Sequence, residues 1–160
     1  APITTPAGLR PATGAAPPSP RRTPDRLLVF IKEGGTRCTA ATSLSFEYSY
    51  TLQLVVTDYA DHADTIMVTV LAWVARHQPE ILANPDRQRD GIQFEADLIN
   101  HTTMDLSVRI RLTERVVVAR TDTGDYTATH VPEPPLDPYD YVESWTLTIR
   151  HPDGSTEEAA

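Results

Sequence analysis

One stretch of the chain changes its hydrophobic period abruptly, and this change constrains the fold more than any other feature. Between Leu44 and Val56 every second residue is apolar or aromatic, and the residues between them are mostly polar. Because side chains on a strand point to opposite faces in turn, this alternation predicts a long strand that buries one face. After Asp64 the apolar residues recur at helical spacing, until the pattern ends at Pro79. The sequence therefore predicts a long strand followed directly by an amphipathic helix.

Further segments have the patterns of strands. Residues 26–32 are a nearly continuous apolar run, which predicts a strand buried on both faces. We expect a turn at Glu33-Gly34-Gly35 to close it, with residues 36–42 pairing back. Residues 92–98 and 104–112 alternate on either side of a polar turn, which predicts a hairpin whose second strand runs on to Val118. The predicted core consists of Phe30, Phe46, Tyr48, Leu52, Leu54, Ile66, Val70, Leu71, Trp73, Phe94, Leu98, Leu106, Val108 and Ile110.

These elements predict an α+β fold, an antiparallel or mixed sheet with one principal amphipathic helix packed on its apolar face. Prolines recur through residues 1–24, and each fixes φ and removes a backbone donor, so we expect a flexible, extended N-terminal arm there. Residues 25–150 are then a single domain, in which residues 121–141 form an extended excursion. Trp145, Leu147 and Ile149 alternate once more before a turn at residues 151–154, which suggests a C-terminal hairpin with residues 151–160 as the tail.

Charge and cysteine content exclude some classes of protein. The net charge of −8 argues against a duplex-binding protein, because phosphate contact needs clustered Lys and Arg. A single cysteine, Cys38, excludes an intrachain disulfide framework and fits a reducing compartment. No apolar run approaches the roughly 20 residues that span a bilayer. The proline-rich N-terminus lacks the apolar segment of a secretory signal, and we do not expect one there.

The densest set of chemically capable side chains lies between the predicted long strand and the helix. Asp58, Asp61, His62 and Asp64 fall within seven positions, and oxygen donors of this kind suit Mg or Mn. Acids are also typical of helix N-termini, where they cap free N–H groups and favour the positive end of the dipole. We expect these acids to cap the helix and to bind no metal. A metal-dependent hydrolase built on the cluster is the alternative, since no other motif for catalysis, cofactor or phosphate binding is present.

Charged residues also gather on the polar face of the strand at 104–112 and just beyond it. Arg109, Arg111 and Arg115 share this face and would repel one another unless carboxylates meet them. Glu95 and Asp97 on the partner strand are natural cross-strand mates. An intrachain charge ladder and an interface between subunits both explain the pattern, and both stay open. The candidate interface residues are Glu95, Asp97, Arg109, Arg111, Thr113, Glu114 and Arg115.

Two long segments of the chain resemble one known family. They read ATSLSFEYSYTLQLVVTDYADHADTIMVTVLAWVARHQPEIL and GIQFEADLINHTTMDLSVRIRLTERVVV, and a weaker likeness returns at PEPPLDP. These segments are similar to the sequences of the tail completion protein R family of contractile-tailed temperate phages, and the similarity extends over roughly residues 24 to 118. Members of the family usually carry a helix near the N-terminus, and the proline-rich arm departs from that pattern.

The resemblance implies that the chain is a structural protein of the virion and not an enzyme. It would assemble in the host cytoplasm and lie at the tail–neck junction of the virion. It would form a ring, usually of six subunits, that caps the tail tube, stops its polymerisation and offers the neck a joining surface. Implied partners are further copies of itself, the tail tube protein, neck or head-completion proteins and the tail sheath. DNA would pass only as cargo through a ring that carries −8 on each of six subunits, −48 in total. No cofactor and no membrane are implied. A head–tail connector or scaffold module that does not stop tube growth is the alternative within the virion.

Overall fold

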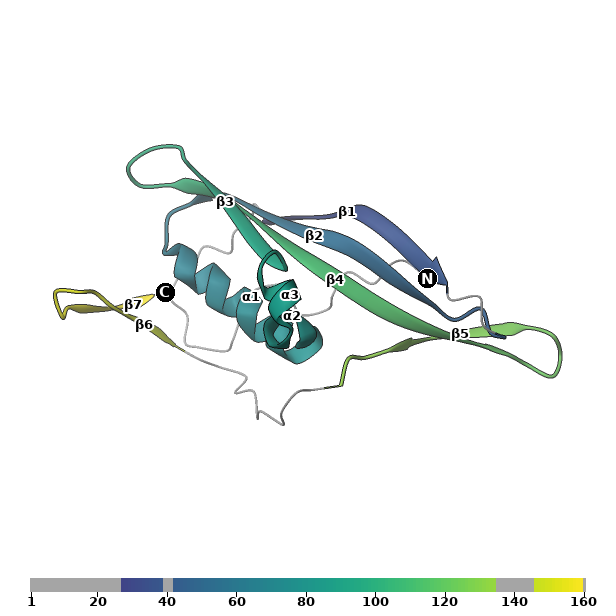
Figure 1. Ribbon diagram of the computed structural model, residues 1–160. Helices are drawn as coiled ribbons and strands as arrows, with labels where there is room; N and C mark the ends of the chain where they lie inside the picture. Colours follow the sequence, from purple (N-terminus) through teal and green to yellow (C-terminus); the bar gives the residue numbers. More distant parts are fainter. Residues whose placement is uncertain (1–26, 39–41, 135–145, 160) are drawn as a thin grey trace, which may run out of the picture.

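A computed structural model of the chain describes residues 27–38, 42–134 and 146–159 (Figure 1). Its main element is a curled antiparallel sheet of five strands in the order β1-β2-β4-β3, with β5 also paired to β4. The strands are β1 (Leu27–Cys38), β2 (Phe46–Tyr59), β3 (Ile92–Leu98), β4 (Met104–Arg120) and β5 (Tyr126–Val131). The predicted arm at residues 1–24 lies outside the described residues.

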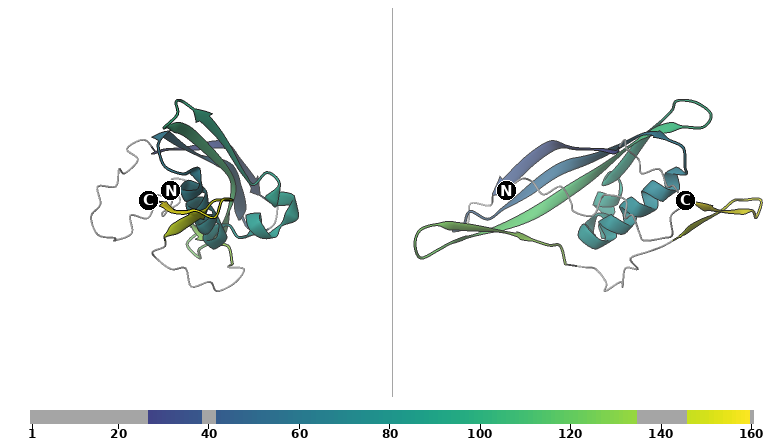
Figure 2. Two further views of the ribbon diagram at one scale, coloured as in Figure 1. Left: turned by 90° about the vertical axis from the view of Figure 1, so that its left-hand side faces the viewer. Right: turned by 180° about the vertical axis from the view of Figure 1, so that it is seen from behind.

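One long helix packs on a single face of this sheet (Figure 2). It is α1 (Ala63–His77), and two short helices follow it, α2 (Glu80–Ala83) and α3 (Pro85–Gln88). Two further strands, β6 (Leu147–Arg150) and β7 (Thr156–Ala159), form a separate hairpin near the chain end. The predicted α+β class, with one principal helix on an antiparallel sheet and a C-terminal hairpin, is confirmed.

The core lies between α1 and the two central strands. Alternate residues of β2 and β4 point towards α1, which meets them with Val70, Trp73 and Val74, so the predicted strand-to-helix unit is confirmed. Leu52, Val74, Leu106 and Ile110 have no exposed surface at all. The remaining members of this core are Tyr50, Leu54, Val70, Trp73, Ile81, Val108 and Leu112.

Four residues of the predicted core are exposed instead. Phe30 is 43% exposed, Leu71 42%, Phe94 62% and Leu98 79%. Leu71 lies on α1 itself, and Phe30 points to the face opposite α1, because its row runs through Gln53 and Arg109. For Phe94 and Leu98 the reason is geometric, because a helix with its side chains is about 10 Å wide and strands lie about 4.8 Å apart. One helix therefore covers about two strands, and α1 covers β2 and β4. The outer strands β1 and β3 keep their apolar side chains without a covering layer among the described residues.

The prediction for residues 26–42 was wrong in its details. β1 is one strand that continues through the expected turn as a bulge, where its register with β2 shifts between Lys32 and Gly35 and Glu33 adopts a φ of 54°. It is exposed along most of its length rather than buried on both faces. Cys38 at its end is exposed as well. Residues 39–41 lie outside the described residues.

The expected excursion at residues 121–141 contains a regular element. Residues 126–131 form β5, which folds back on the far half of β4 around a turn whose Gly124 has a φ of +92°. This local hairpin forms where β4 extends past the body of the sheet, as Figure 1 shows. Residues 135–141, and Trp145 of the later alternation, lie outside the described residues.

The outer edge of β4 has a gap that a side chain fills. β3 pairs with β4 only as far as Ile110, and β5 begins to pair with it at Arg115. Between them, the side chain of Gln78 accepts a hydrogen bond from the Thr113 N–H at 3.2 Å and donates one to the Thr113 carbonyl at 2.8 Å. Gln78 is only 8% exposed. Its amide thus replaces the missing strand at this level, because it offers the same donor and acceptor as a peptide group.

Candidate subunit interface

The predicted arginine face exists on the side of the sheet opposite α1. Because Ile110 and Leu112 are buried under the helix, the alternating Arg109 and Arg111 point the other way. Arg109 forms an ion pair with Glu95 of β3, one of the two predicted mates. The Nη1 atom of Arg111 lies 2.6 Å from Oδ2 of Asp90, which stands in the loop before β3. These two arginines are therefore part of an intrachain ladder.

The sequence does not identify Asp90 as the partner of Arg111, because the dipeptide Asp90-Gly91 indicates only a turn. Its position follows from the backbone, since the Arg111 N–H donates to the Gly91 carbonyl at 2.9 Å. A Cβ built on Gly91 would lie 2.5 Å from the carbonyl oxygen of Arg87 and 2.6 Å from Cγ2 of Ile81. Only glycine fits there without displacing these neighbours, so the turn holds Asp90 in a fixed place beside β4.

The other two predicted charges have no ion pair within the described part of the chain. Arg115 is exposed, and Glu47 on β2 is its neighbour in register. Asp97 stands opposite Asp105 rather than opposite an arginine. The Oδ1 atom of Asp105 accepts a hydrogen bond from the backbone N–H of Asp58 at 2.9 Å. Asp97 therefore faces a carboxylate of the same charge, and no cation of the described chain forms an ion pair with it. The expectation that Asp97 pairs with an arginine of its own sheet is wrong.

Glu114 lies on the opposite face from its neighbours Thr113 and Arg115, and groups of its own chain bind it. The Tyr50 hydroxyl donates a hydrogen bond to Oε1, and Nδ1 of His130 on β5 lies 3.3 Å from Oε2. Burial, followed by the hydrogen bond and the negative charge of Glu114, raises the pKa of Tyr50 well above its ordinary value. The phenol therefore stays protonated and continues to donate. Glu114 joins β2, β4 and β5 within one subunit.

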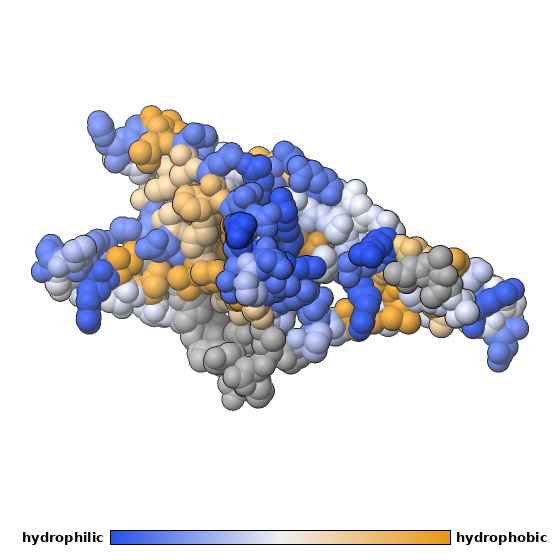
Figure 3. Space-filling model, viewed as in Figure 1, coloured by the Kyte–Doolittle hydropathy of each residue, from blue (hydrophilic) through white to orange (hydrophobic). Residues whose placement is uncertain are grey.

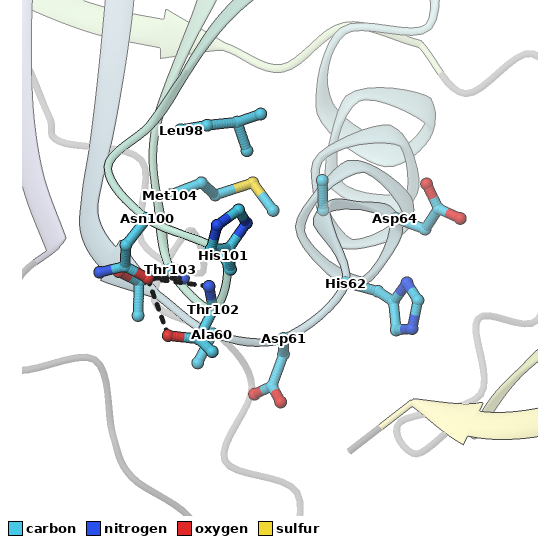
Figure 4. Close-up of a pocket in the computed structure, with 11 residues that line it drawn as sticks. Ala60, Asp61, His62, Asp64, Leu98, Asn100, His101, Thr102, Thr103 and Met104 are labelled. Carbon is cyan, nitrogen blue, oxygen red and sulfur yellow. Dashed lines mark hydrogen bonds between the residues drawn. The ribbon is translucent and has the colours of Figure 1, made fainter.

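The acidic loop before α1 borders a surface depression of about 400 Å³ between it and the β3–β4 turn (Figure 4). Asp61, His62 and Asp64 point in different directions there. Across the depression, the Oδ1 atom of Asn100 accepts hydrogen bonds from the Thr102 N–H at 2.8 Å and the Thr103 N–H at 2.9 Å, which closes the predicted turn. No three His, Cys, Asp or Glu side chains of residues 27–38, 42–134 and 146–159 are placed to hold a metal ion.

The expected capping of α1 by acids is only partly right. The N-cap residue is His62, and it makes no side-chain hydrogen bond to the helix backbone. Asp64 stands in the first turn, where a negative charge favours the helix dipole. His62 instead directs Nε2 towards Oε1 of Glu157 at 2.6 Å, and Nε2 of His151 approaches the same atom at 3.0 Å. This loop therefore contacts the β6–β7 hairpin through a carboxylate.

Apolar surface gathers where α1 fails to cover the sheet. Figure 3 shows it along the β3–β4 hairpin and continuing towards α1, where Leu71, Phe94, Leu98 and Ile99 are exposed. β1 adds a second patch, Leu28 to Ile31, at the other edge of the sheet. None of the described helices is long and apolar enough to cross a membrane. Contiguous apolar surface that no described residue covers is typical of a site for another protein.

Comparisons with known proteins agree with one another. Residues 3–134 match the model of a family described as P2 phage tail completion protein R. The tail completion protein R of Escherichia phage P2 is 40% identical over 112 residues, which cover 70% of this chain and 72% of that protein. No solved structure matches the chain significantly.

Proposed function

The chain belongs to the P2 phage tail completion protein R family, and from this membership we propose how it completes a phage tail. Its role is tail completion, and it is a structural protein of the virion. In our proposal, copies of the chain form a ring, with six as the expected number, on the last layer of the tail tube. The ring stops further addition of tube subunits and offers the neck proteins a surface on which to join.

The observation that carries the proposal is the family match along residues 3–134, with a relative at 40% identity. The described surface is compatible with assembly. Head-to-tail contacts need two different surfaces on each subunit, and they form a ring when the rotation between neighbours closes. This sheet has two different outer strands. Exposed charge on the face opposite α1, with Arg115 and Asp97 the clearest cases, is available for neighbouring subunits or the tail sheath.

DNA passes through the ring as cargo in this proposal. Arg109 and Arg111 are held by carboxylates of their own subunit, so they are not free cations that would retain phosphates. A total charge of −48 for six copies at −8 each would keep a duplex mobile by repulsion, over a Debye length of roughly 8 Å at physiological salt.

Complementation tests the proposal. A phage that lacks its own tail completion protein R is supplied with this chain, together with the tube and neck proteins of the phage from which the chain derives. We expect tails of uniform length that carry the protein at the head-proximal end and join heads. The surface variant Leu44→Ser serves as a positive control, because Leu44 is 57% exposed and lies outside the paired strands, just before β2. Overlong tails that nevertheless carry the protein would identify a connector that does not stop polymerisation. A chain absent from purified tails would refute the proposal.

A further inference from the structure

The two outer strands of the sheet are open edges. Beyond β1 on one side and β3 on the other, no further strand pairs with them among the described residues. Leu28, Val29, Phe30 and Ile31 of β1 are 50%, 38%, 43% and 38% exposed. Long, exposed, apolar edge strands are avoided in proteins that act alone, because their free N–H and C=O groups recruit other strands. These edges therefore point to a partner that supplies a strand.

The apolar parts of the two edges lie at the same level of the sheet. Val29 is paired in register with Leu54, Leu54 with Val108, and Val108 with Phe94. Ile31 is joined to Ile92 in the same way, through Leu52 and Ile110. Each row contains two buried central residues, which place all of its members on the α1 side. Each row thus continues to both edges. Val29 and Phe94, the ends of the first row, are exposed, as is Ile31 of the second row, whereas Ile92 is half-buried against the core.

The other face of each edge differs in charge. Lys32 on β1 has no carboxylate partner in the described chain, and its ammonium lies 5.8 Å from the centre of the Phe30 ring. On β3 the same face carries Glu95 and Asp97, and Asp97 has only Asp105 opposite it. β1 also carries Arg37 and Glu33, and the Glu33 carboxylate accepts a hydrogen bond from the Thr51 hydroxyl. The charges of β1 (Lys32, Glu33 and Arg37) therefore sum to +1, whereas those of β3 (Glu95 and Asp97) sum to −2. This complementarity favours a contact between the two edges over a contact of either edge with its own copy.

We propose that β1 of one copy of the chain pairs with β3 of the next, so that the sheets of neighbouring subunits form one continuous sheet around the ring. Repeating the order β1-β2-β4-β3 head to tail sets β3 antiparallel to the incoming β1, as every other neighbouring pair in the sheet is. Any register shifted by an even number of residues keeps the apolar side chains on the α1 side and the charged ones opposite. The inference rests on the proposed ring and names the surfaces that build it.

Cross-linking between copies tests this contact directly. Phe30 and Gln93 occupy one row, through Gln53 and Arg109, on the face opposite α1. In a Cys38→Ser background, Phe30→Cys and Gln93→Cys are made as separate proteins and treated with a flexible bismaleimide, alone and mixed, over a concentration series. We expect the mixture to give several-fold more covalent dimer than either variant alone. The matched control replaces Gln93→Cys with Asp122→Cys, which lies in the exposed β4–β5 turn.

A second variant separates loss of the contact from loss of the fold. Val29→Lys places a charge on the apolar side of the edge strand, and it should abolish the cross-link while the far-UV circular dichroism stays that of the parent. Leu44→Lys, an equally drastic change at a residue outside the paired strands, should leave the cross-link intact. Retention of the cross-link in a folded Val29→Lys variant would count against the strand pairing.

Three results would overturn the proposal. The first is a mixture that gives no more dimer than the single variants at any concentration, and the second is efficient dimer from one variant alone, which would mean a symmetric contact. The third is a cross-link from Phe30→Cys to tail tube subunits in purified tails with none between copies. Because the reaction needs no tail, its failure leaves tail completion standing. Conversely, a cross-linked chain that is absent from complemented tails would contradict the proposed function and not the contact.

Discussion

The side chain of Gln78 offers the sharpest test of how this sheet is held together. Its amide bridges the gap in the β4 edge between β3 and β5 by pairing with both backbone groups of Thr113. Gln78→Leu keeps the approximate volume but removes the donor and the acceptor together. Each buried backbone group left without a partner costs about 1–3 kcal/mol, and Thr113 is partly exposed, so the total should be roughly 2–4 kcal/mol.

Urea unfolding followed by far-UV circular dichroism measures this loss as a lower midpoint at an unchanged m value. Gln93→Leu is the matched control, because Gln93 is exposed on β3, and a surface change of this kind should stay within about 0.5 kcal/mol. If Gln78→Leu is also within about 0.5 kcal/mol of the parent, then water satisfies Thr113 as well as the amide does, and the argument fails.

Gln78→Glu adds a pH dependence with a definite sign. The carboxyl keeps an acceptor for the Thr113 N–H, but it can donate to the Thr113 carbonyl only when it is protonated. Burial beside that carbonyl should raise the pKa of the new carboxyl above its value of about 4.3 in the unfolded chain. The protonated form is then favoured by folding, so the stability of this variant relative to the parent is highest below that value and falls as the pH rises through the raised pKa. The free energy of unfolding of Gln78→Glu relative to the parent should therefore differ between about pH 4 and about pH 8, which lie roughly below and above the titration of the new carboxyl. An equal difference at both pH values would contradict the proposed geometry.

Four further predictions follow from the same structure. Leu54→Ala should lower the free energy of unfolding by about 2–4 kcal/mol in urea titrations, because Leu54 is 3% exposed, whereas Leu44→Ala at a 57% exposed site should have little effect. Gly91→Ala should cost about 1–3 kcal/mol, since its Cβ would meet the Arg87 carbonyl, and an unchanged midpoint would show that the α3–β3 turn relaxes freely. Calorimetric titration with Mg, Mn or Zn should show no micromolar binding, and a stoichiometric signal lost in Asp61→Ala would instead support the hydrolase alternative. Assembled protein should not bind duplex DNA with sub-micromolar affinity at physiological salt, and tight binding with a steep salt dependence would mean that the arginines are free to contact phosphate.

The centre of the fold could be predicted from the sequence because its signals are local and strong. The alternation through Leu52 and Leu54 and the helical spacing at Val70 and Trp73 each require one face to be buried, and each face is buried against the other. The hairpin of β3 and β4 was equally predictable, because Asn100 marks its turn and closes it with side-chain hydrogen bonds. In both cases the residues that carry the pattern are close together in the chain.

What could not be predicted either carries little pattern of its own or depends on contacts between distant segments. β5 consists largely of exposed side chains and forms because β4 offers it an edge, so its own residues carry little pattern. The partner of Arg111 depends on where a turn places Asp90, and the role of Gln78 depends on a gap between two strands that is visible only once they are paired. In the sequence Glu114 is one of three consecutive polar residues. Because side chains alternate along β4, it lies on the opposite face from its two neighbours and contacts Tyr50.

The errors at the edges of the sheet have a different origin. Phe30, Phe94 and Leu98 were assigned to the core because they continue an apolar pattern, and in the single subunit they are exposed. A periodic pattern records that a face is removed from water, but it does not record whether the covering atoms belong to the same chain. A side chain that a neighbouring subunit covers leaves the same signature as one that an intrachain helix covers. If β1 and β3 pair between copies as proposed, the sequence pattern describes the buried surface of the assembled ring. The cross-linking experiment would then decide whether these assignments misread the chain or described its assembled state.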